Sequence, residues 1–430
     1  MSFTDSFRSV PYLPANDQSV PIEIQSNTLN RPIPSSVSTV AINSGSGDQT
    51  SGGFSTIMIP TGMSTGAIKP SSAYLRFDFA AVISGTGTHS FKLPAGSAAS
   101  CIRQITVSIG GQTLEQINQY GVYHNQLLLH ATNRNYLEGD AAIQEGAGLV
   151  AVTRASGTAY TFCVPLALGL FNSSRAVPLY LMNGSPIQVQ VDWALPSECV
   201  RASGTETITS TTVSNVQFVY DSVSLDDSFK QAVKMRMADA QNPALYQLEY
   251  DTVLANRTAN AQNINLNLGV NSSSVKSLLY SVVNDGADAN TARKFTYGLT
   301  ATGAAESYLY LDGRQVNNIR IDKPEVAFVE TQKSLGLAFS PELSYGASAV
   351  NTAVEFPTSR TTYITDYFLG GINTTRFNSQ GNAMVGSPCT QMQIVRTANQ
   401  AVVAGSNLYY FIVHSVIIAI DAMGNVTLVR

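Results

Sequence analysis

The sequence predicts an all-β protein that consists of two tandem eight-stranded antiparallel jelly rolls with a few short helices. Three observations lead to this prediction. Short segments in which apolar and polar residues alternate recur along the chain, and Gly, Pro, Asn and Ser residues separate them. Two stretches of about 180 residues each hold roughly eight such segments, the number that a jelly roll arranges in two sheets. Helical periodicity is rare and does not alternate with the strands, which argues against a parallel α/β sheet.

Composition and periodicity divide the chain into four segments. Residues 1–47 are rich in Pro, Ser and Asn. We expect an extended N-terminal arm there, because Pro favours extended backbone and has no N–H for a sheet ladder. The first jelly roll is expected over 48–223 and a connecting helix over 224–242. The second jelly roll is expected over 243–430.

A strand, a glycine turn and a helix follow one another inside the first predicted roll. Residues 102–109 alternate between β-branched apolar and polar residues, which is the period of a half-buried strand. Gly110-Gly111 permits a tight turn with positive φ, and 113–117 returns as a short strand. From Asn118 the spacing of apolar and aromatic residues changes to three or four. This spacing predicts a helix with one face formed by Tyr120, Tyr123, Leu127 and His130.

The other strands of the first roll are short and end at turn residues. Pro165 lies inside the apolar segment 162–170, so we expect that segment to be a bent or edge strand. Residues 133–159 are polar and rich in small side chains, and a surface loop is expected there. Strands are predicted over 54–59, 73–83, 90–93, 162–170, 187–193 and 216–223.

The connecting helix has a start and a stop signal. Ser224 is the predicted N-cap, and Asp226 and Asp227 lie in the first turn, where the helix dipole favours negative charge. Asn242-Pro243 ends the helix, because Pro cannot continue it.

In the second roll, Asp312-Gly313 predicts a hairpin turn. Residues 326–331 are expected to form a short helix or a loop. The strands of this roll are predicted over 245–254, 264–268, 275–283, 295–299, 308–311, 316–321, 335–339, 362–368, 392–395, 408–420 and 426–429.

The composition points to a protein whose surface is covered by other subunits. Charged residues make up 13% of the chain, about half the usual share, and the net charge is −4. Charge keeps free monomers apart, whereas the cores of protein interfaces are depleted in charge. An extracellular β-protein rich in Ser and Thr is the alternative that composition leaves open.

The N-terminal arm is not suited to bind nucleic acid. Its basic residues are Arg8 and Arg31, and it carries three acidic residues. Affinity for nucleic acid comes from many Lys and Arg side chains that release counterions from the phosphates. No direct sequence-specific binding of nucleic acid is therefore expected.

The cysteines and the apolar segments indicate the cellular compartment in which the protein is made. The four cysteines lie far apart without a Cys-x-x-Cys pair, so we expect buried free thiols rather than a zinc site or a disulfide framework. The N-terminus lacks the basic region and apolar run of a signal peptide. The longest apolar run, 408–420, is too short to span a bilayer as a helix. We expect synthesis inside the cell and no secretion. The cysteines are Cys101, Cys163, Cys199 and Cys389.

No motif predicts an enzyme, and we expect no catalytic, cofactor-binding or metal-binding residues. His124 and His130 are six residues apart, so they do not share a helix face as His-x-x-x-His would. Glu115 and the adjacent residues Asp226 and Asp227 have no partner carboxylate that the sequence indicates. Such residues cap a helix or face solvent more often than they form the catalytic pair of a glycosidase. Neither a phosphate-binding loop nor a Gly-x-Ser-x-Gly motif occurs.

Several ordered motifs resemble double jelly-roll major capsid proteins of double-stranded DNA viruses and related phages, the adenovirus-like and nucleocytoplasmic large DNA virus-like lineage. The segment Ile109-Gly110-Gly111-Gln112-Thr113-Leu114, followed by an aromatic-rich helix, is similar to a segment of the family's first roll. Ser273-Ser274-Val275 departs from the family's His-Pro-Val. Further similar segments are 164–166, 177–181, 187–191, 196–199, 219–226, 275–283, 371–377 and 408–429.

This resemblance implies a structural major capsid protein. Its trimers would form pseudo-hexameric capsomers that tile an icosahedral shell, and the protein would reside in the virion. The implied partners are two further copies, neighbouring capsomers, penton and minor capsid proteins, and an internal membrane. The arm would tie neighbouring capsomers or contact an inner protein or membrane layer.

Two alternatives remain open. A tandem β-sandwich spike protein that binds carbohydrate or a receptor needs an exposed aromatic site, whereas the sole tryptophan, Trp193, lies within a strand alternation. A β-sandwich hydrolase needs paired carboxylates in a cleft.

Overall fold

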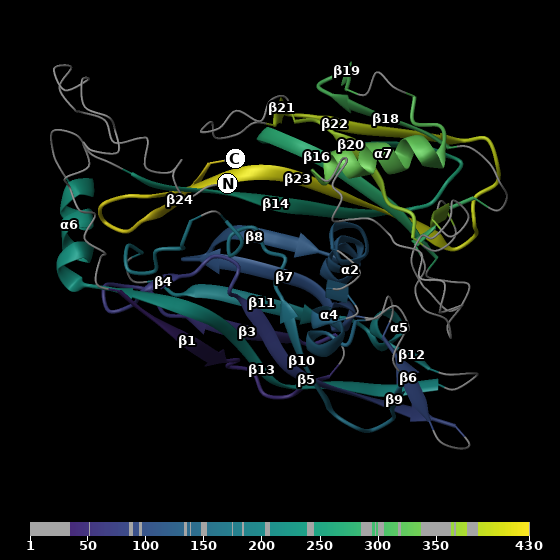
Figure 1. Ribbon diagram of the computed structural model, residues 1–430. Coiled ribbons are helices and arrows are strands. Elements are labelled where there is room, and N and C mark those ends of the chain that lie inside the picture. The colour runs from purple at the N-terminus through teal and green to yellow at the C-terminus, as the bar shows by residue number, and fades with distance from the viewer. Residues whose placement is uncertain are drawn as a thin grey trace.

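The computed structural model describes residues 35–50, 52–85, 89–93, 97–132, 136–137, 139–147, 153–173, 175–182, 185–202, 207–238, 245–284, 295–296, 298–299, 305–316, 320–336, 363–364, 367–375 and 386–429. Two β-sandwiches lie side by side, and helix α2 lies at the boundary between them (Figure 1). The first roll spans strands β1 to β13, and the second roll spans strands β14 to β24.

The first roll has the strand order of a jelly roll. In chain order its eight main strands are β1, β3, β5, β7, β8, β10, β11 and β13. The first, eighth, third and sixth strands form one sheet, and the second, seventh, fourth and fifth form the other. All of these pairs are antiparallel. The bounds are β1 Ser35–Asn43, β3 Phe54–Ile59, β5 Tyr74–Ser84, β7 Ile102–Ile109, β8 Gln112–Asn118, β10 Tyr160–Pro165, β11 Ile187–Trp193 and β13 Thr207–Leu225.

The second roll repeats the same order. Its first, eighth, third and sixth strands form one sheet, and its second, seventh, fourth and fifth form the other. The predicted fold of two tandem antiparallel jelly rolls is therefore confirmed. The bounds are β14 Tyr246–Ala259, β15 Asn263–Leu268, β16 Ser272–Asn284, β18 Ala305–Leu311, β19 Arg314–Gln315, β20 Gly370–Asn373, β22 Met392–Ala398 and β23 Ser406–Ile420.

Short strands accompany these sheets. In the first roll they are β2 (Gln49–Thr50), β4 (Ala67–Ile68), β6 (Ser90–Lys92), β9 (Arg154–Ala155) and β12 (Arg201–Ala202). Three of them, β12, β6 and β9, form a separate small sheet in that order. In the second roll they are β17 (Phe295–Thr296), β21 (Ser387–Cys389) and β24 (Val426–Val429).

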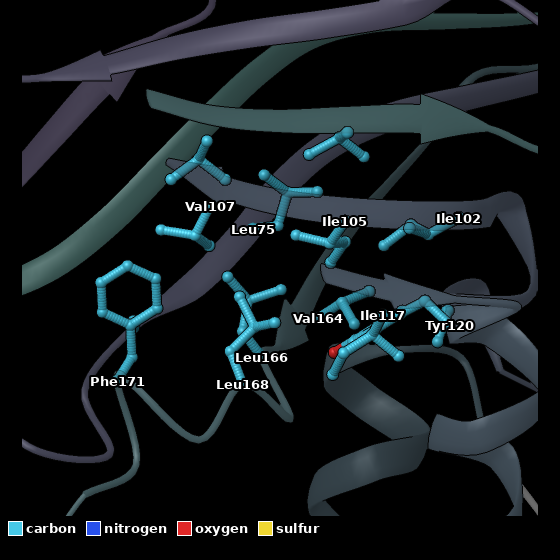
Figure 2. Packing of buried hydrophobic residues seen from close by; sticks show 14 of the residues in the cluster. Leu75, Ile102, Ile105, Val107, Ile117, Tyr120, Val164, Leu166, Leu168 and Phe171 are labelled. Atoms are coloured by element: carbon cyan, nitrogen blue, oxygen red, sulfur yellow. The ribbon is translucent and has the colours of Figure 1, made fainter. Parts of the chain in front are cut away.

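The core of the first roll follows from the alternation in its strands. In β11 every second residue from Ile187 to Trp193 is buried, as the sequence predicts. The Trp193 ring lies 5.1 Å from the Phe77 ring, and its Nε1 donates a hydrogen bond to Ser55 Oγ at 2.9 Å. Figure 2 shows aliphatic side chains of both sheets meeting in this core, with Leu75 and Val107 among them.

The segment 1–47, predicted to be an extended arm, contains a strand. Ser35–Asn43 forms strand β1, which pairs along its whole length with β13. This segment contains β-branched residues and follows the last of the arm's prolines, so its backbone is free to join a ladder. The sequence does not indicate this strand, because Ser35–Thr39 is exposed on both faces and lacks the expected alternation.

The connecting helix is α6 (Asp227–Met237), and its N-cap differs from the prediction. Asp226, not Ser224, is the N-cap, and its side chain accepts a hydrogen bond from the Ser228 N–H. Ser224 is the penultimate residue of β13, so it belongs to the ladder instead. Residues 239–244, which include the predicted stop, lie outside the described residues.

The segment 133–159 is not a simple surface loop. It contains helix α4 (Asp140–Gln144) and strand β9, and the buried residue Glu145 lies between them. Just before β7, the short 3₁₀ helix η4 (Ala98–Cys101) was not predicted. Its sequence has small buried residues but no helical apolar periodicity that could have indicated it.

Several predictions in the second roll are refined. Asp312 and Gly313 both have positive φ, 48° and 77°, which is the conformation of the predicted hairpin turn. The segment 326–331 is part of helix α7 (Pro324–Ser334). The returning strand is β19, earlier than the predicted 316–321, while Ile321 forms a single bridge to Ser307.

Two further predicted strands are not formed in the described residues, although Tyr367 makes a β-bridge. Residues 363–364 are helical instead of extended, and 335–336 form a turn after α7. The remainder of 335–339 lies outside the described residues, as do residues 362 and 365–366 of the other segment. Among the described helices, none has the length and apolar character needed to cross a membrane.

Candidate functional site

Several buried polar side chains lie at the junction between the two rolls, where helix α2 (Tyr120–Ala131) is placed (Figure 1). Ten of the 12 residues of α2 are buried. Toward the second roll, the Tyr123 ring lies 5.4 Å from the Phe411 ring, and Gln126 Nε2 donates a hydrogen bond to Ser281 Oγ at 3.0 Å. The helix is therefore covered by both rolls. For this reason the residues outside the predicted face of the helix are buried as well.

A buried polar cluster fixes α2 to the first roll. Glu145 Oε2 accepts a hydrogen bond from Ser97 Oγ at 2.6 Å and lies 2.8 Å from His124 Nε2. Tyr120 Oη accepts a hydrogen bond from the Ala167 N–H at 2.8 Å. A buried carboxylate is stable only where hydrogen-bond donors surround it. The cluster therefore holds α2 against η4 and α4 instead of exposing a reactive group.

Glu115 of β8 is a second buried carboxylate at the junction. Its two oxygens accept hydrogen bonds from the Gly169 N–H at 2.9 Å and the Leu170 N–H at 3.1 Å. Burial raises the pKa of Glu115 to about 7, although these backbone donors oppose the rise. The expectation that this carboxylate faces solvent or caps a helix is wrong, because Glu115 is buried in the middle of β8, beside β14 of the second roll.

Two close approaches to backbone carbonyl groups complete the seam between the rolls. Tyr250 Oη donates a hydrogen bond to the Leu114 carbonyl at 2.7 Å. Gly169 lies so close to β14 that a Cβ atom there would be 1.6 Å from the Asp251 carbonyl oxygen. The seam thus requires glycine at this position, since any side chain would push the two rolls apart.

A cleft of about 340 Å³ opens beside this seam, between β8, β14 and β23. Among the residues that line it, Glu115 is the one carboxylate. A glycoside hydrolase needs two carboxyl groups across the scissile bond, and this cleft offers one. Its other polar lining residues are Thr113, Gln116, Asn118, Thr252 and His414.

The histidines are not brought together. His124 is engaged by Glu145, whereas the ring of fully buried His130 lies 6.5 Å from the Tyr363 ring. Burial lowers the pKa of His130 to about 4. His414 lies on β23, with Nδ1 3.5 Å from Ser272 Oγ. Within the described ranges, no three His, Cys, Asp or Glu side chains are placed to hold a metal ion.

The remaining residues weighed as site candidates have structural positions. Trp193 is 1% exposed. Asp227 lies 3.1 Å from Lys230 on α6. The four cysteines are free thiols; Cys101, Cys199 and Cys389 are buried as predicted, and Cys163 is half-buried.

The sequence motifs do not indicate the junction. One signal was present in residues 277–283 of β16, where apolar residues run on without a charged residue. Strands that are buried on both faces have this pattern. Gly169 and Gln126 carried no local signal, because their role depends on a partner far along the chain.

No family model matches the chain, and no curated protein matches it. Solved structures share its fold. The VP54 protein of PBCV-1, fitted into a reconstruction of the virophage Sputnik, has a TM-score of 0.60 and 13% identity, and the match covers 93% of this chain and 98% of that one. The Faustovirus major capsid protein has a TM-score of 0.58 and 8% identity, with 97% and 96% covered. The mavirus major capsid protein has a TM-score of 0.50 and 12% identity, with 98% and 95% covered.

These identities are low, so the likeness concerns the fold. It extends over nearly the full length of each chain and includes both rolls. The predicted resemblance to double jelly-roll major capsid proteins is confirmed at that level.

Proposed function

We propose that the protein is a structural major capsid protein whose trimers form pseudo-hexameric capsomers of an icosahedral virus shell. The observation that supports this best is the pair of jelly rolls with one repeated strand order, joined across a buried junction. Three such chains would place six similar rolls around one axis, and near-hexagonal blocks tile a flat facet. The low share of charged residues, 13%, fits a surface that other copies cover.

The proposed role sets the partners and the location. Two further copies complete the capsomer, and neighbouring capsomers surround it. Penton and minor capsid proteins, and an internal membrane, are further proposed contacts. The protein would be made in the host cell interior and would reside in the virion.

We assign the role of an arm to residues 1–34, because Ser35–Asn43 is part of the first roll. The first roll then runs from Ser35 to Leu225, α6 forms the connection, and the second roll begins at Tyr246. The proposed arm ties neighbouring capsomers or contacts an inner protein or membrane layer. Its few basic residues do not suit contact with the genome.

The alternative, a spike protein that binds carbohydrate or a receptor, has less support. The sole tryptophan, the aromatic residue considered for a sugar platform, is buried, and Phe54 is the one aromatic among the exposed large apolar side chains of the described residues. A hydrolase also has less support, because the cleft beside the seam is lined by one carboxylate and a glycoside hydrolase needs two. A structural role without catalysis is therefore the proposal.

The mass of the purified chain in solution, measured by light scattering after gel filtration, tests the proposal. A particle near three times the chain mass of 45.8 kDa, or a shell built from such particles, is the expected result. A stable monomer that binds glycans on an array would contradict it and favour the spike protein.

A further inference from the structure

The two rolls have the same topology. Each roll has a helix between its fifth and sixth strands and a sheet on which such a helix can pack, and within one chain the first roll's helix packs on the second roll's sheet. Helix α2 lies between the fifth strand, β8, and the sixth strand, β10, of the first roll. It packs on the sheet of the second roll that contains β16 and β23. Helix α7 lies between the fifth and sixth strands of the second roll, β19 and β20. It therefore occupies the place in the second roll that α2 occupies in the first.

The two helices differ in how much of them is covered. In α2, ten of 12 residues are buried, because the second roll covers the side that the first roll leaves open. In α7, three of 11 residues are buried within the described chain, and these are Pro324, Ala327 and Thr331. Thr331 Oγ1 donates to the Leu369 carbonyl at 2.8 Å, so this side of α7 faces its own roll. On the other side, Val329 is 48% exposed.

The sheets that correspond to each other show the same difference. The third strand of the second roll, β16, is buried on both faces from residue 277 to 283. The third strand of the first roll, β5, alternates, and its residues that point away from the core are exposed or half-buried within the described chain. We call the face that these residues form the outer face of the β5 sheet. Val82 of β5 is 42% exposed on it. Val37 of β1, the edge strand of the same sheet, is 60% exposed.

We infer that α7 of one copy packs on the outer face of the β5 sheet of a second copy and so repeats between chains the contact that α2 makes within the chain. This inference rests on the proposed function, because it names the surfaces by which the copies of a capsomer meet. Figure 1 places α7 and β5 at opposite ends of the molecule, so one chain cannot make this contact with itself. The contact is head-to-tail, and such contacts close into a ring when the rotation per copy divides a full turn.

Charge is compatible with this pairing. Helix α7 and its N-cap residue Lys323 together carry two lysines and two glutamates, so this segment has no net charge. The outer face of the β5 sheet carries Arg76 and Asp78, which are held by neighbours on the same face. Asp78 accepts hydrogen bonds from Thr161 and Asn215. We expect this interface to be more polar than the one inside the chain, where Leu279, Val283 and Phe411 fill the corresponding face.

Two substitutions test the inference on the full chain. Val329→Asp places a charge on α7, and Val82→Asp places one on the outer face of the β5 sheet. Val429→Asp on β24 is the matched control, because Val429 is also 48% exposed but lies on neither surface. Burying an unpaired carboxylate at an interface should weaken association by roughly 100-fold. Light scattering should then show monomers for both variants and the wild-type mass for the control.

Mixing the two variants distinguishes a head-to-tail contact from a symmetric one. The Val329→Asp copy keeps an intact sheet face, and the Val82→Asp copy keeps an intact helix. One interface can therefore form between them, but a ring cannot close. We expect the mixture to contain particles of twice the chain mass. A mixture that stays monomeric would show that the helix and this sheet face are not partners.

Cross-linking provides a second test if a variant folds poorly. In a Cys163→Ser background, Val82→Cys and Val329→Cys chains are mixed and oxidised with glutathione disulfide. A disulfide-linked dimer is expected, and the Val82→Cys and Val429→Cys mixture is the control. A wild-type trimer in which none of these changes has an effect would overturn this inference and leave the proposed function intact. A wild-type chain that never assembles would overturn the proposed function itself.

Discussion

Gln126 of α2 donates a hydrogen bond from Nε2 to Ser281 Oγ at 3.0 Å, and Ser281 Oγ in turn donates to the Phe368 carbonyl at 2.7 Å. The two residues are 155 positions apart and belong to different rolls. All three groups are buried. These two consecutive hydrogen bonds link helix α2 to β16 in a contact that is otherwise apolar.

Gln126→Ala should destabilise the junction. It removes the donor to Ser281 and leaves a cavity between the rolls, and we expect a loss of about 1–2 kcal/mol in the free energy of unfolding. Urea unfolding followed by the fluorescence of Trp193 measures this change. Gln116→Ala is the matched control, because Gln116 lies exposed on β8, and it should have little effect. Equal losses in both variants would show that the hydrogen bond across the junction contributes nothing specific.

Glu115 should make the protein less stable as the pH rises. Its pKa is raised from 4.5 to about 7 by burial, so the folded state binds this proton more tightly than the unfolded chain does. Stability from this group is then complete below pH 4.5 and falls as the pH rises to about 7, by about 3 kcal/mol in total. In Glu115→Gln this part of the pH dependence should disappear. Urea unfolding at several pH values measures the difference, and identical slopes for both proteins would contradict it.

His130 should act in the opposite direction. Burial lowers its pKa from 6.5 to about 4, so the unfolded chain binds this proton more readily. The stability contributed by neutral His130 is complete above pH 6.5 and is lost as the pH falls to about 4, again by about 3 kcal/mol. His130→Leu removes this acid sensitivity. Thermal unfolding of both proteins at pH 7 and pH 4.5 tests it, with a smaller difference between the two pH values expected for the variant.

The alternation of apolar and polar residues made the fold predictable. In β5 and β11 one face is buried and the other is not, so the period of two is visible in the sequence. Strand β1 was missed because Ser35–Thr39 is exposed on both faces and shows no such period. The number of strands and their antiparallel order could therefore be predicted better than the place where the first roll begins.

The junction was much less predictable, for a physical reason. Glu115 and His124 look like ordinary polar residues in the sequence, and what sets their roles is burial by residues more than 20 positions away. Gly169 shows no turn signal, because its lack of a side chain serves a contact with β14 rather than a positive φ. Long-range contacts of this kind leave no periodic pattern in a single sequence.

Deletion of residues 1–34 should separate assembly of the capsomer from assembly of the shell. The deletion leaves β1 and both rolls intact, so trimers should still form at the wild-type mass. If the arm ties neighbouring capsomers, extended shells should be lost in electron micrographs. Deletion of residues 1–47 is the informative comparison, because it also removes β1 and should lower the stability of the first roll. Normal shells from the shorter deletion would contradict the proposed role of the arm.

Gly169→Ala should be the most damaging of the small changes at the junction. The new Cβ would lie 1.6 Å from the Asp251 carbonyl oxygen, and backbone atoms cannot yield as a flexible side chain would. The loop must then move away from β14, which also strains the hydrogen bonds from Gly169 and Leu170 to Glu115. We expect a loss of about 3 kcal/mol in the free energy of unfolding, at the upper end for overpacked sites. Gly269→Ala is the control, because no atom lies within 4 Å of its added Cβ, and the loss there should be well under that of Gly169→Ala. If the two variants unfold at the same urea concentration, the close approach of the rolls at Gly169 does not constrain the junction.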